Sequence, residues 1–461
     1  MQQTLILDHD LIRRYDQSGP RYTSYPTAVQ FHDGFGNAQY RDAAAASNAS
    51  GRPLSLYFHL PFCDTVCFYC ACNKVVTKDR GRAQPYLDRM HREIEMQAAL
   101  FDRGRPIDQL HWGGGTPTFI SAQQMRELMA VTGRHFQLRD DDSGEYSIEI
   151  DPREVTPETI GLLREIGFNR MSLGLQDLDP RVQKAVNRIQ TAEQTFGALS
   201  AARHEGFRSI SVDLIYGLPL QTPDSFIDTL DRVIEAAPDR LSVFNYAHLP
   251  ERFKPQRRIN ESELPSPDQK LDILQRAGQH LADAGYVYIG MDHFARPDDE
   301  LAVAQREGHL YRNFQGYSTH ADCDLVAIGV TSIGMVGDTY AQNVRTLDEY
   351  YARIDAGELA VFRGIELSRD DRLRRAVITD LICNFSLDFG QVSAAWDIQF
   401  DRYFAAEIKR LEVMADDGLI AFSGDRVDVL PVGRLLIRNI CMVFDRYLDA
   451  DGQTTRFSKV I

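Results

Sequence analysis

Short strands alternate with amphipathic helices over most of this chain, and this alternation limits the fold more than any other feature. It begins at residue 54, and one helical stretch, residues 86–100, places Leu87, Met90 and Ile94 on a single face. The seven expected strands are residues 54–59, 109–112, 147–150, 170–175, 209–215, 241–247 and 287–292. Strands separated by helices form a parallel sheet, which closes into a barrel or stays open as a doubly wound fold.

The residues at the helix ends agree with a repeated βα unit. A hydroxyl residue that can cap a helix precedes a proline at Thr156-Pro157, Thr222-Pro223 and Ser266-Pro267. A glycine that can end a helix precedes an aromatic residue at Gly167, Gly206 and Gly285. The first two glycines are 39 residues apart and the last two are 79 apart, close to twice that period. About six units are expected, which predicts an α/β fold with a partial (β/α)6-type barrel or a complete one.

Two regions lie outside the alternation. Residues 19–27 are rich in Gly, Pro, Thr and Ser and predict an extended N-terminal arm. Beyond residue 366 the pattern is helical, with an expected hairpin around Gly424 and a last helix from Gly433. The expected division is an arm at 1–50, a barrel and its extension at 51–366, and a mainly helical, winged-helix-like C-terminal domain at 367–461.

Four of the seven cysteines fall within ten residues: Cys63, Cys67, Cys70 and Cys72. A structural zinc site usually has two C-x2-C pairs or a histidine, which this spacing does not supply. A closed iron–sulfur cluster held by all four is disfavoured because Cys70 and Cys72 are too close in sequence to ligate neighbouring irons comfortably. The spacing favours an open cluster held by Cys63, Cys67 and Cys70, with one iron free of protein ligands.

Polar or glycine residues follow several strands, where barrel enzymes place their sites. Trp112 is followed by three glycines, which let the backbone approach a ligand closely. Glu149 alternates with apolar neighbours, so it points to the opposite face of its strand, toward the barrel interior. Further candidates at or just beyond strand ends are Gln176, Arg188, Asp213 and Ala247. Each alone is more easily structural, but together they indicate a site at one end of the barrel.

The overall charge limits the partners. The chain has 51 basic and 66 acidic residues, a net charge of −15, which argues against nucleic acid or an anionic membrane as the main partner. The N-terminal residues have no signal-peptide pattern, and the apolar stretch at 325–337 is shorter than the ~18 residues of a spanning helix. We expect a cytoplasmic protein without membrane insertion, with a monomer as the default.

The cysteine motif C-x3-C-x-aromatic-C, with Tyr69 as the aromatic residue, resembles the cluster motif of the radical S-adenosylmethionine (SAM) superfamily. Five further segments narrow the resemblance to the oxygen-independent coproporphyrinogen III dehydrogenase family: residues 21–27, 57–63, 111–118, 149–154 and 313–317. The resemblance covers nearly the whole chain. It implies a radical SAM barrel and an oxidoreductase of haem biosynthesis that converts coproporphyrinogen III to protoporphyrinogen IX, two propionates becoming two vinyl groups.

The resemblance also implies the cofactors and their residues. One [4Fe–4S] cluster is expected on Cys63, Cys67 and Cys70, whereas Cys72 is characteristic of the family without being a ligand. Two SAM molecules are expected. The cluster-bound SAM is expected to contact Tyr57, Gly114, Glu149 and Ile333. The second is expected near Tyr69, Gly115, Thr116, Gln176, Arg188, Asp213 and Ala247.

The reaction itself is expected to involve Phe314, Gln315 and Cys72, with a 5′-deoxyadenosyl radical taking hydrogen from the propionate. A reducing donor such as flavodoxin or ferredoxin is implied. The substrate carries four carboxylates, so an acidic protein needs local cations, for which Arg21, Arg296 and Arg312 are candidates by placement. The alternative is a haem-binding chaperone on the same radical SAM fold.

Overall fold

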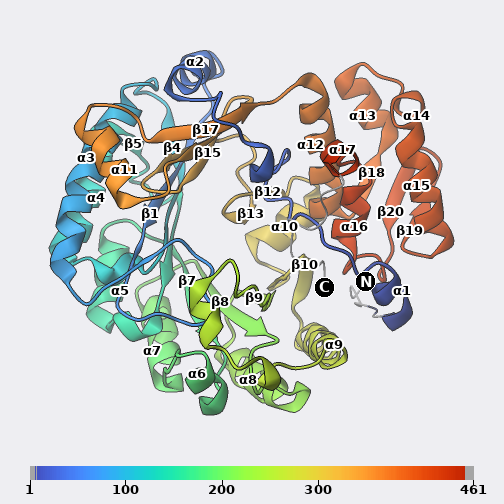
Figure 1. Cartoon of the computed structure of the whole chain (residues 1–461), viewed down its shortest axis with the longest axis horizontal. Coiled ribbons are helices and arrows are strands. Elements are labelled where there is room, and N and C mark those ends of the chain that lie inside the picture. The colour runs from blue at the N-terminus through green and yellow to red at the C-terminus, as the bar shows by residue number, and fades with distance from the viewer. Residues whose placement is uncertain (1–5, 7, 452–461) are drawn as a thin grey trace.

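A computed structural model describes residue 6 and residues 8–451. Its largest sheet is built around a run of adjacent parallel strands, which curve along one side of the molecule in Figure 1. In spatial order these strands are β1 (Leu54–Leu60), β4 (Pro106–Gly114), β6 (Glu145–Ile150), β7 (Arg170–Gln176), β8 (Ser209–Tyr216) and β9 (Arg240–Asn245). Beyond β1 the sheet continues with β14 (Asp324–Ile328), parallel to β1, and then with the antiparallel strands β15 (Ile333–Val336), β16 (Thr339–Asn343) and β17 (Val361–Glu366). The sheet path ends at β10 and β17, which do not pair with each other, so the barrel is partial.

The last expected strand is present, but it is not part of the parallel set. Strand β10 (Val287–Gly290) pairs antiparallel with β11 (His293–Ala295), and β11 pairs antiparallel with β9. Only two residues join β10 to β11, too few for the crossover that a parallel pair needs. The expectation that the repeat extends to residues 287–292 is therefore corrected.

Helices cover the outside of the curved parallel sheet (Figure 1). They are α3 (Ala83–Ala98), α4 (Ala122–His135), α5 (Pro157–Glu165), α6 (Pro180–Ala185), α7 (Ala192–His204), α8 (Pro223–Ala236) and α9 (Pro267–Asp283). The expected caps are confirmed at three helix starts, where Thr156, Thr222 and Ser266 each accept a hydrogen bond from the third helical N–H. No helix in the described part of the chain has the length and apolar content to cross a membrane.

The strands separate an apolar outside from a polar inside. On β8, Ile210, Val212 and Leu214 are completely buried in the apolar core, whereas Ser211 and Asp213 line the interior cavity. Alternate side chains of a strand point to opposite faces, so one strand contributes both to the core and to the site. The barrel interior is therefore a polar chamber rather than a filled core.

The C-terminal domain lies beside the open side of the barrel (Figure 1). It consists of α12 (Arg369–Asn384), β18 (Ser386–Asp388), α13 (Phe389–Trp396), α14 (Phe400–Tyr403), α15 (Ala405–Asp416), β19 (Ile420–Phe422), β20 (Arg426–Val429), α16 (Ile437–Met442) and α17 (Arg446–Asp451). The expected hairpin is β19 and β20, and β18 adds to it as a third strand that the sequence did not predict. Helices followed by this small sheet give the expected winged-helix-like arrangement.

The N-terminal arm contacts both the C-terminal domain and the barrel. Its helices are α1 (His9–Arg14) and α2 (Asn37–Asn48), and residues 19–22 between them form no helix or strand. The Tyr22 hydroxyl donates to Asp445 at 3.0 Å, and Arg438 Nε donates to the Pro20 carbonyl at 2.9 Å. Residue Arg21 reaches the other way, with Nη1 2.8 Å from Asp292 Oδ2 beside β11. The arm is therefore held between the C-terminal domain and the β10–β11 hairpin.

Candidate active site

The four clustered cysteines lie in the loop that leaves the carboxyl end of β1. This loop contains the short strands β2 (Phe62–Cys63) and β3 (Val75–Val76), which pair with each other. All four cysteines line one cavity, together with Gly114, Gly115 and Thr116 from the end of β4. The cysteine and glycine motifs, about 50 residues apart in sequence, thus form one site.

The surroundings of the sulfur atoms fit thiolate ligands of a cluster. Thr116 Oγ1 lies 3.6 Å from Cys63 Sγ and donates to it. Two guanidinium groups donate to Cys67 Sγ, Arg188 Nη1 at 3.7 Å and Arg153 Nη2 at 3.8 Å.

Glycine is required at position 115 because the cysteine loop passes over it. A Cβ at this position would lie 2.7 Å from the Phe62 carbonyl oxygen and from the Pro61 carbonyl carbon. The Gly115 N–H donates to the Leu60 carbonyl at 2.8 Å, and the Thr116 N–H donates to the Phe62 carbonyl at 2.7 Å. This close backbone contact fixes the start of the cysteine loop against the end of β4.

Glu149 is held by the neighbouring strand. The Gly114 N–H donates to Glu149 Oε2 at 3.1 Å, and His111 Nε2 lies 3.5 Å from Oε1. Burial acts to raise the pKa of Glu149, but the contacts with His111 and Gly114 outweigh it and lower the pKa. The carboxylate is therefore ionised at neutral pH and offers a negative charge to an ammonium or a hydroxyl donor.

Two histidines that the sequence analysis did not single out complete this side of the site. The rings of Tyr57 and His111 stack with centroids 5.8 Å apart at 11°, and the Tyr57 hydroxyl lies 3.1 Å from His59 Nδ1. Burial lowers the pKa of His59, so the ring is neutral. Both histidines occupy alternate, interior-facing strand positions, the same signal that identified Glu149.

A buried ion pair supports the other wall of the cysteine cavity. Arg188 Nη1 lies 2.6 Å from Asp151 Oδ2, and each side chain is only 8 % exposed. Arg188 Nη2 also donates to the Gly174 carbonyl at 2.7 Å. Asp151 is a further site residue that the sequence did not predict.

The carboxylate of Asp213, on β8, is also buried in this wall. Burial raises the pKa of Asp213 to about 6, and Ser172 Oγ donates to its carboxylate at 2.7 Å.

The structure brings most of the expected site residues to two neighbouring cavities that share Glu149. The cysteine cavity is lined by Tyr69, Gly114, Gly115, Thr116, Glu149, Gln176, Arg188 and Asp213. The second cavity is lined by Tyr57, Glu149, Phe314, Gln315 and Ile333. Phe314 and Gln315 form the turn between β12 (Tyr311–Asn313) and β13 (Gly316–Ser318).

Two residues expected in the site, Ala247 and Arg296, do not line these two cavities. Ala247 is not among the residues that line these two cavities; its carbonyl accepts a hydrogen bond from Gln256 Nε2, which also donates to the Tyr69 carbonyl. Arg296 lies at the amino ends of the parallel strands, where its N–H donates to the carbonyl of Asp239 just before β9. Its side chain is 46 % exposed and pairs with Asp298. The cysteine loop leaves the opposite ends of the strands.

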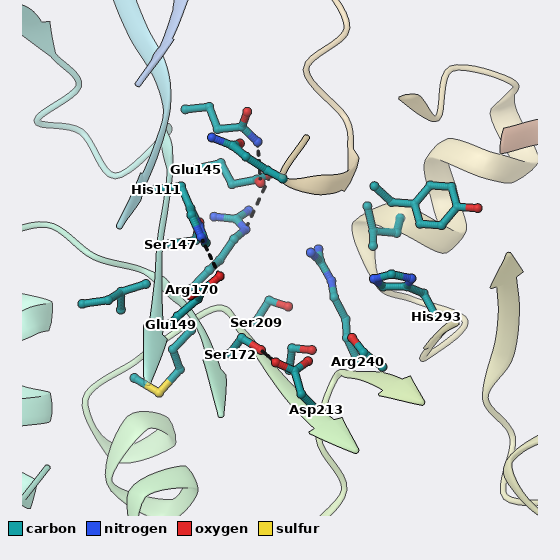
Figure 2. Close-up of a pocket in the computed structure, with 18 of the residues that line it drawn as sticks. His111, Glu145, Ser147, Glu149, Arg170, Ser172, Ser209, Asp213, Arg240 and His293 are labelled. Atoms are coloured by element: carbon teal, nitrogen blue, oxygen red, sulfur yellow. Dashed lines mark hydrogen bonds and ion pairs between the residues drawn. The ribbon is translucent and has the colours of Figure 1, made fainter. Parts of the chain in front are cut away.

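A third cavity occupies the barrel interior and extends the site. Glu149 and Asp213 line both this cavity and the cysteine cavity. Figure 2 shows His111 and Glu149 on one side and His293 on the other, with Arg240 between them. Because the three cavities share residues, a large substrate has a continuous polar chamber next to the cysteine loop.

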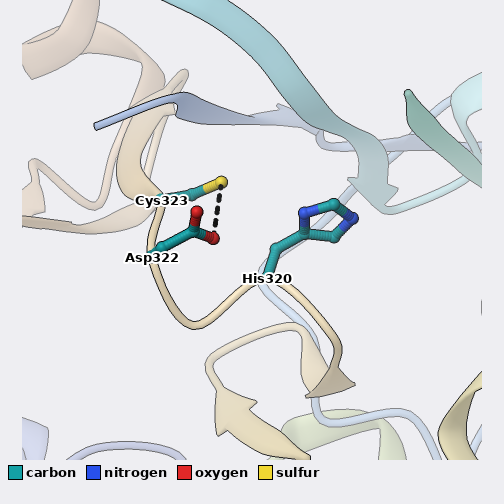
Figure 3. A group of neighbouring side chains, drawn as sticks. All are labelled: His320, Asp322 and Cys323. Atoms are coloured by element: carbon teal, nitrogen blue, oxygen red, sulfur yellow. Dashed lines mark hydrogen bonds between the residues drawn. The ribbon is translucent and has the colours of Figure 1, made fainter. Parts of the chain in front are cut away.

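One other group of potential metal ligands lies outside these cavities: His320, Asp322 and Cys323 (Figure 3). The Cys323 sulfur faces the Asp322 carboxylate, and burial, followed by Asp322 and other carboxylates, raises the pKa of the Cys323 thiol. A metal needs the thiolate form. We assign no metal to this group.

The family resemblance implies that Glu149 contacts SAM, so replacing it by glutamine is expected to weaken SAM binding about 10- to 100-fold, the size of a lost hydrogen bond to a charged group. The substitution keeps the shape of the side chain and removes its charge. Equilibrium binding of SAM to the cluster-loaded protein measures the effect, and the iron content serves as the control because Glu149 touches no cysteine sulfur in the described contacts. Unchanged SAM affinity would contradict the role.

Comparison with known proteins agrees with this geometry. A family model described as "Radical SAM superfamily" matches residues 57–233, which include the cysteine loop and strands β4 to β8. A partial parallel barrel with this cysteine motif at the end of its first strand defines a radical SAM protein. A second family model, "HemN C-terminal domain", matches residues 367–436.

Full-length relatives narrow the class further. The chain is 59% identical to "Oxygen-independent coproporphyrinogen III oxidase" of Pseudomonas aeruginosa over 461 residues, with 100% of both chains covered. It is 52% identical to the Escherichia coli protein of the same name, covering 100% of this chain and 99% of the other. A solved structure titled "Coproporphyrinogen III oxidase (HemN) from Escherichia coli is a Radical SAM enzyme" superimposes with a TM-score of 0.92 at 51% identity, covering 97% of this chain and 100% of the other. The chain belongs to the oxygen-independent coproporphyrinogen III oxidase family. The family expected from the sequence is thereby confirmed, under the name oxidase rather than dehydrogenase.

Proposed function

We propose that the protein converts coproporphyrinogen III to protoporphyrinogen IX without oxygen, as a radical SAM oxidoreductase of haem biosynthesis. The observation that carries the proposal is the cavity in which three cysteines, a glycine-rich strand end and Glu149 meet, within a chain 59% identical along its whole length to an oxidase of this name. Each propionate that reacts loses a hydrogen atom from its β-carbon, then carbon dioxide and one electron, which passes to a one-electron acceptor, and leaves a vinyl group.

The radical SAM family implies a [4Fe–4S] cluster and SAM. When bound, they supply a 5′-deoxyadenosyl radical that takes the hydrogen atom from the propionate. We propose Cys63, Cys67 and Cys70 as the cluster ligands. The support is their shared cavity and the three donors directed at Cys63 and Cys67.

The remaining groups of the site bind and orient. Glu149 and the adjacent Gly114 offer a carboxylate and backbone polar groups to the amino-acid end of SAM, with Tyr57 and Ile333 beside them in the second cavity. We propose a second SAM at the other wall of the cysteine cavity. This wall carries Tyr69, Gly115, Thr116, Gln176, Arg188 and Asp213. Ala247 belongs to this set only through Gln256, which links its carbonyl to that of Tyr69.

Phe314 and Gln315 close the second cavity from the β12–β13 turn. The Phe314 ring meets Tyr340 edge to face at 5.8 Å, which makes this wall apolar. We propose that the turn excludes water from the reacting carbon and positions the propionate. Cys72, exposed at the rim of the cysteine cavity, is proposed to act on the substrate rather than to bind iron.

Three further parts of the proposal concern the setting of the enzyme. A low-potential donor such as flavodoxin or ferredoxin supplies the electron that SAM cleavage consumes. The cluster thiolates require a reducing compartment, which favours the cytoplasm. We propose domain boundaries near residues 50 and 366, because β17 ends at Glu366 and α12 begins at Arg369.

Anaerobic incubation of the reconstituted protein with a reductant, SAM, coproporphyrinogen III and an added one-electron acceptor tests the function. We expect carbon dioxide, 5′-deoxyadenosine and a divinyl product, with two molecules of carbon dioxide per product. Equilibrium dialysis with labelled SAM counts the bound molecules, and two per chain are expected. Tight retention of haem with no carbon dioxide would instead support the chaperone.

A further inference from the structure

The arginines on the floor of the barrel interior are already neutralised. Arg240 Nε lies 2.9 Å from Asp299 Oδ2, and Arg170 Nη2 lies 2.5 Å from Glu300 Oε1. Figure 2 places both arginines in the interior cavity. Because their charges are paired with carboxylates of the chain, they are poor candidates for binding the carboxylates of a substrate.

Arg312 is different. Its side chain on β12 is 8 % exposed overall, and its Cζ lies 4.7 Å above the centre of the Tyr317 ring. The Nε and Nη1 atoms are buried and have no hydrogen-bond partner among the described residues. A buried guanidinium with unused donors carries a large desolvation cost, which a bound anion would offset.

The Tyr317 ring connects Arg312 to the active-site chamber. Tyr317 meets His293 edge to face at 5.3 Å and 85°, and both residues line the interior cavity with Gln315, Glu149 and Asp213. Burial, followed by Arg312, Arg21 and Arg240, lowers the pKa of His293 to about 3, so the ring is neutral. Its Nδ1 atom is also buried and has no hydrogen-bond partner in the described part of the chain.

A second arginine with unused donors, Arg434, lies over the neighbouring aromatic ring of Phe385. Arg434 Cζ is 4.9 Å above the Phe385 ring, and its Nε and Nη1 are likewise buried without a partner among the described residues. A Cβ built on Gly290 would be 2.4 Å from the Tyr317 hydroxyl and 3.3 Å from Phe385 Cζ. The two rings that carry Arg312 and Arg434 therefore meet at Gly290, where the barrel extension contacts the C-terminal domain.

A third arginine of this region, Arg21, comes from the N-terminal arm. Arg21 and Arg312 both act on His293 and both act to lower the pKa of Arg438, for which burial is the largest cause. Arg21 is itself paired with Asp292 at 2.8 Å, so its charge, like those of Arg170 and Arg240, is already neutralised.

We propose that Arg312, assisted by Arg434, binds a propionate carboxylate of the tetrapyrrole and determines the specificity of the enzyme for carboxylated substrates. The inference rests on the proposed function and names the residues that recognise its substrate. A guanidinium presents two parallel N–H groups to a carboxylate, which is a strong and directional contact. The two segments that build the subsite are the β12–β13 hairpin and the C-terminal domain, so substrate binding joins both.

Binding of coproporphyrin III, the oxidised and unreactive form of the substrate, tests the inference by fluorescence titration with and without esterification of its carboxyl groups. Arg312→Met keeps a side chain of similar length over Tyr317 but removes the charge. We expect it to weaken binding of the acid about 10- to 100-fold and to leave binding of the tetramethyl ester unchanged. Arg312→Lys is expected to lie between Arg312→Met and wild type because it keeps the charge and loses the paired donors.

Arg296→Gln is the matched control, since this arginine is exposed at the amino ends of the strands. It is expected to bind the acid like wild type. Wild-type affinity in both Arg312→Met and Arg312→Lys would overturn the inference, as would equal affinity of the wild type for acid and ester. Product formation by the wild type is scored separately, so failure of the proposed function is distinguished from failure of this subsite. SAM affinity and iron content of each folded variant should stay at wild-type values.

Discussion

Replacing Cys67 by alanine is expected to remove the iron–sulfur cluster and with it all SAM cleavage. Cys67 is 8 % exposed, and its sulfur is the acceptor for both Arg153 and Arg188. A methyl group cannot bind iron, and no other thiol is placed to take over with the same two donors. Iron and sulfide analysis, with the visible absorbance of the reconstituted protein, measures the loss, and 5′-deoxyadenosine formation should fall below detection.

Cys72→Ala provides the matched control in the same loop. Cys72 is exposed, and in this proposal it is not a cluster ligand. We expect its variant to keep a full cluster and to cleave SAM, while product formation falls. A Cys67→Ala protein with wild-type iron content, or a Cys72→Ala protein without a cluster, would reverse the assignment of the ligands.

Local sequence signals predicted much of the fold correctly. The helix starts at Thr156, Thr222 and Ser266 depend on a side chain and a proline that are adjacent in sequence, so no tertiary information is needed. The strand-end argument likewise located Glu149 and Asp213, because alternation alone decides which face a side chain occupies. Family resemblance, rather than spacing, supplied the assignment of individual residues to cofactors.

Other site residues could not be predicted because their partners are distant in sequence. The Arg188–Asp151 pair joins loops 37 residues apart, and nothing local identifies Asp151 as the partner. Arg296 and Arg312 flank Phe314 in sequence, but the hairpin of β10 and β11 places Arg296 at the other end of the barrel. Arg434 was missed because it belongs to the C-terminal domain, and only the packing of Phe385 near Tyr317 at Gly290 brings it to the site.

Arg105 is expected to contribute strongly to stability outside the site. Arg105 pairs with Asp324 at the start of β14, and the two side chains are only 3 % and 2 % exposed. Its Nη1 donates to Ser47 at 2.9 Å and its Nε to the Arg52 carbonyl at 2.6 Å. One guanidinium thus joins the end of α2, the entry to β1 and the start of β14.

Arg105→Met should destabilise the protein by about 3–5 kcal/mol, since it leaves the Asp324 carboxylate buried without its cation. Thermal and urea unfolding of the cluster-free protein measure the change, so that cluster loss does not contribute. Arg126→Met is the control, because Arg126 and its partner Glu165 are 49 % and 60 % exposed and water screens such a pair. The Arg126 variant should unfold like wild type. If the double variant Arg105→Met, Asp324→Leu recovers most of the lost stability, the cost arises from the unpaired carboxylate; if it does not, the hydrogen bonds to Ser47 and Arg52 are what hold α2 and β1 against the sheet.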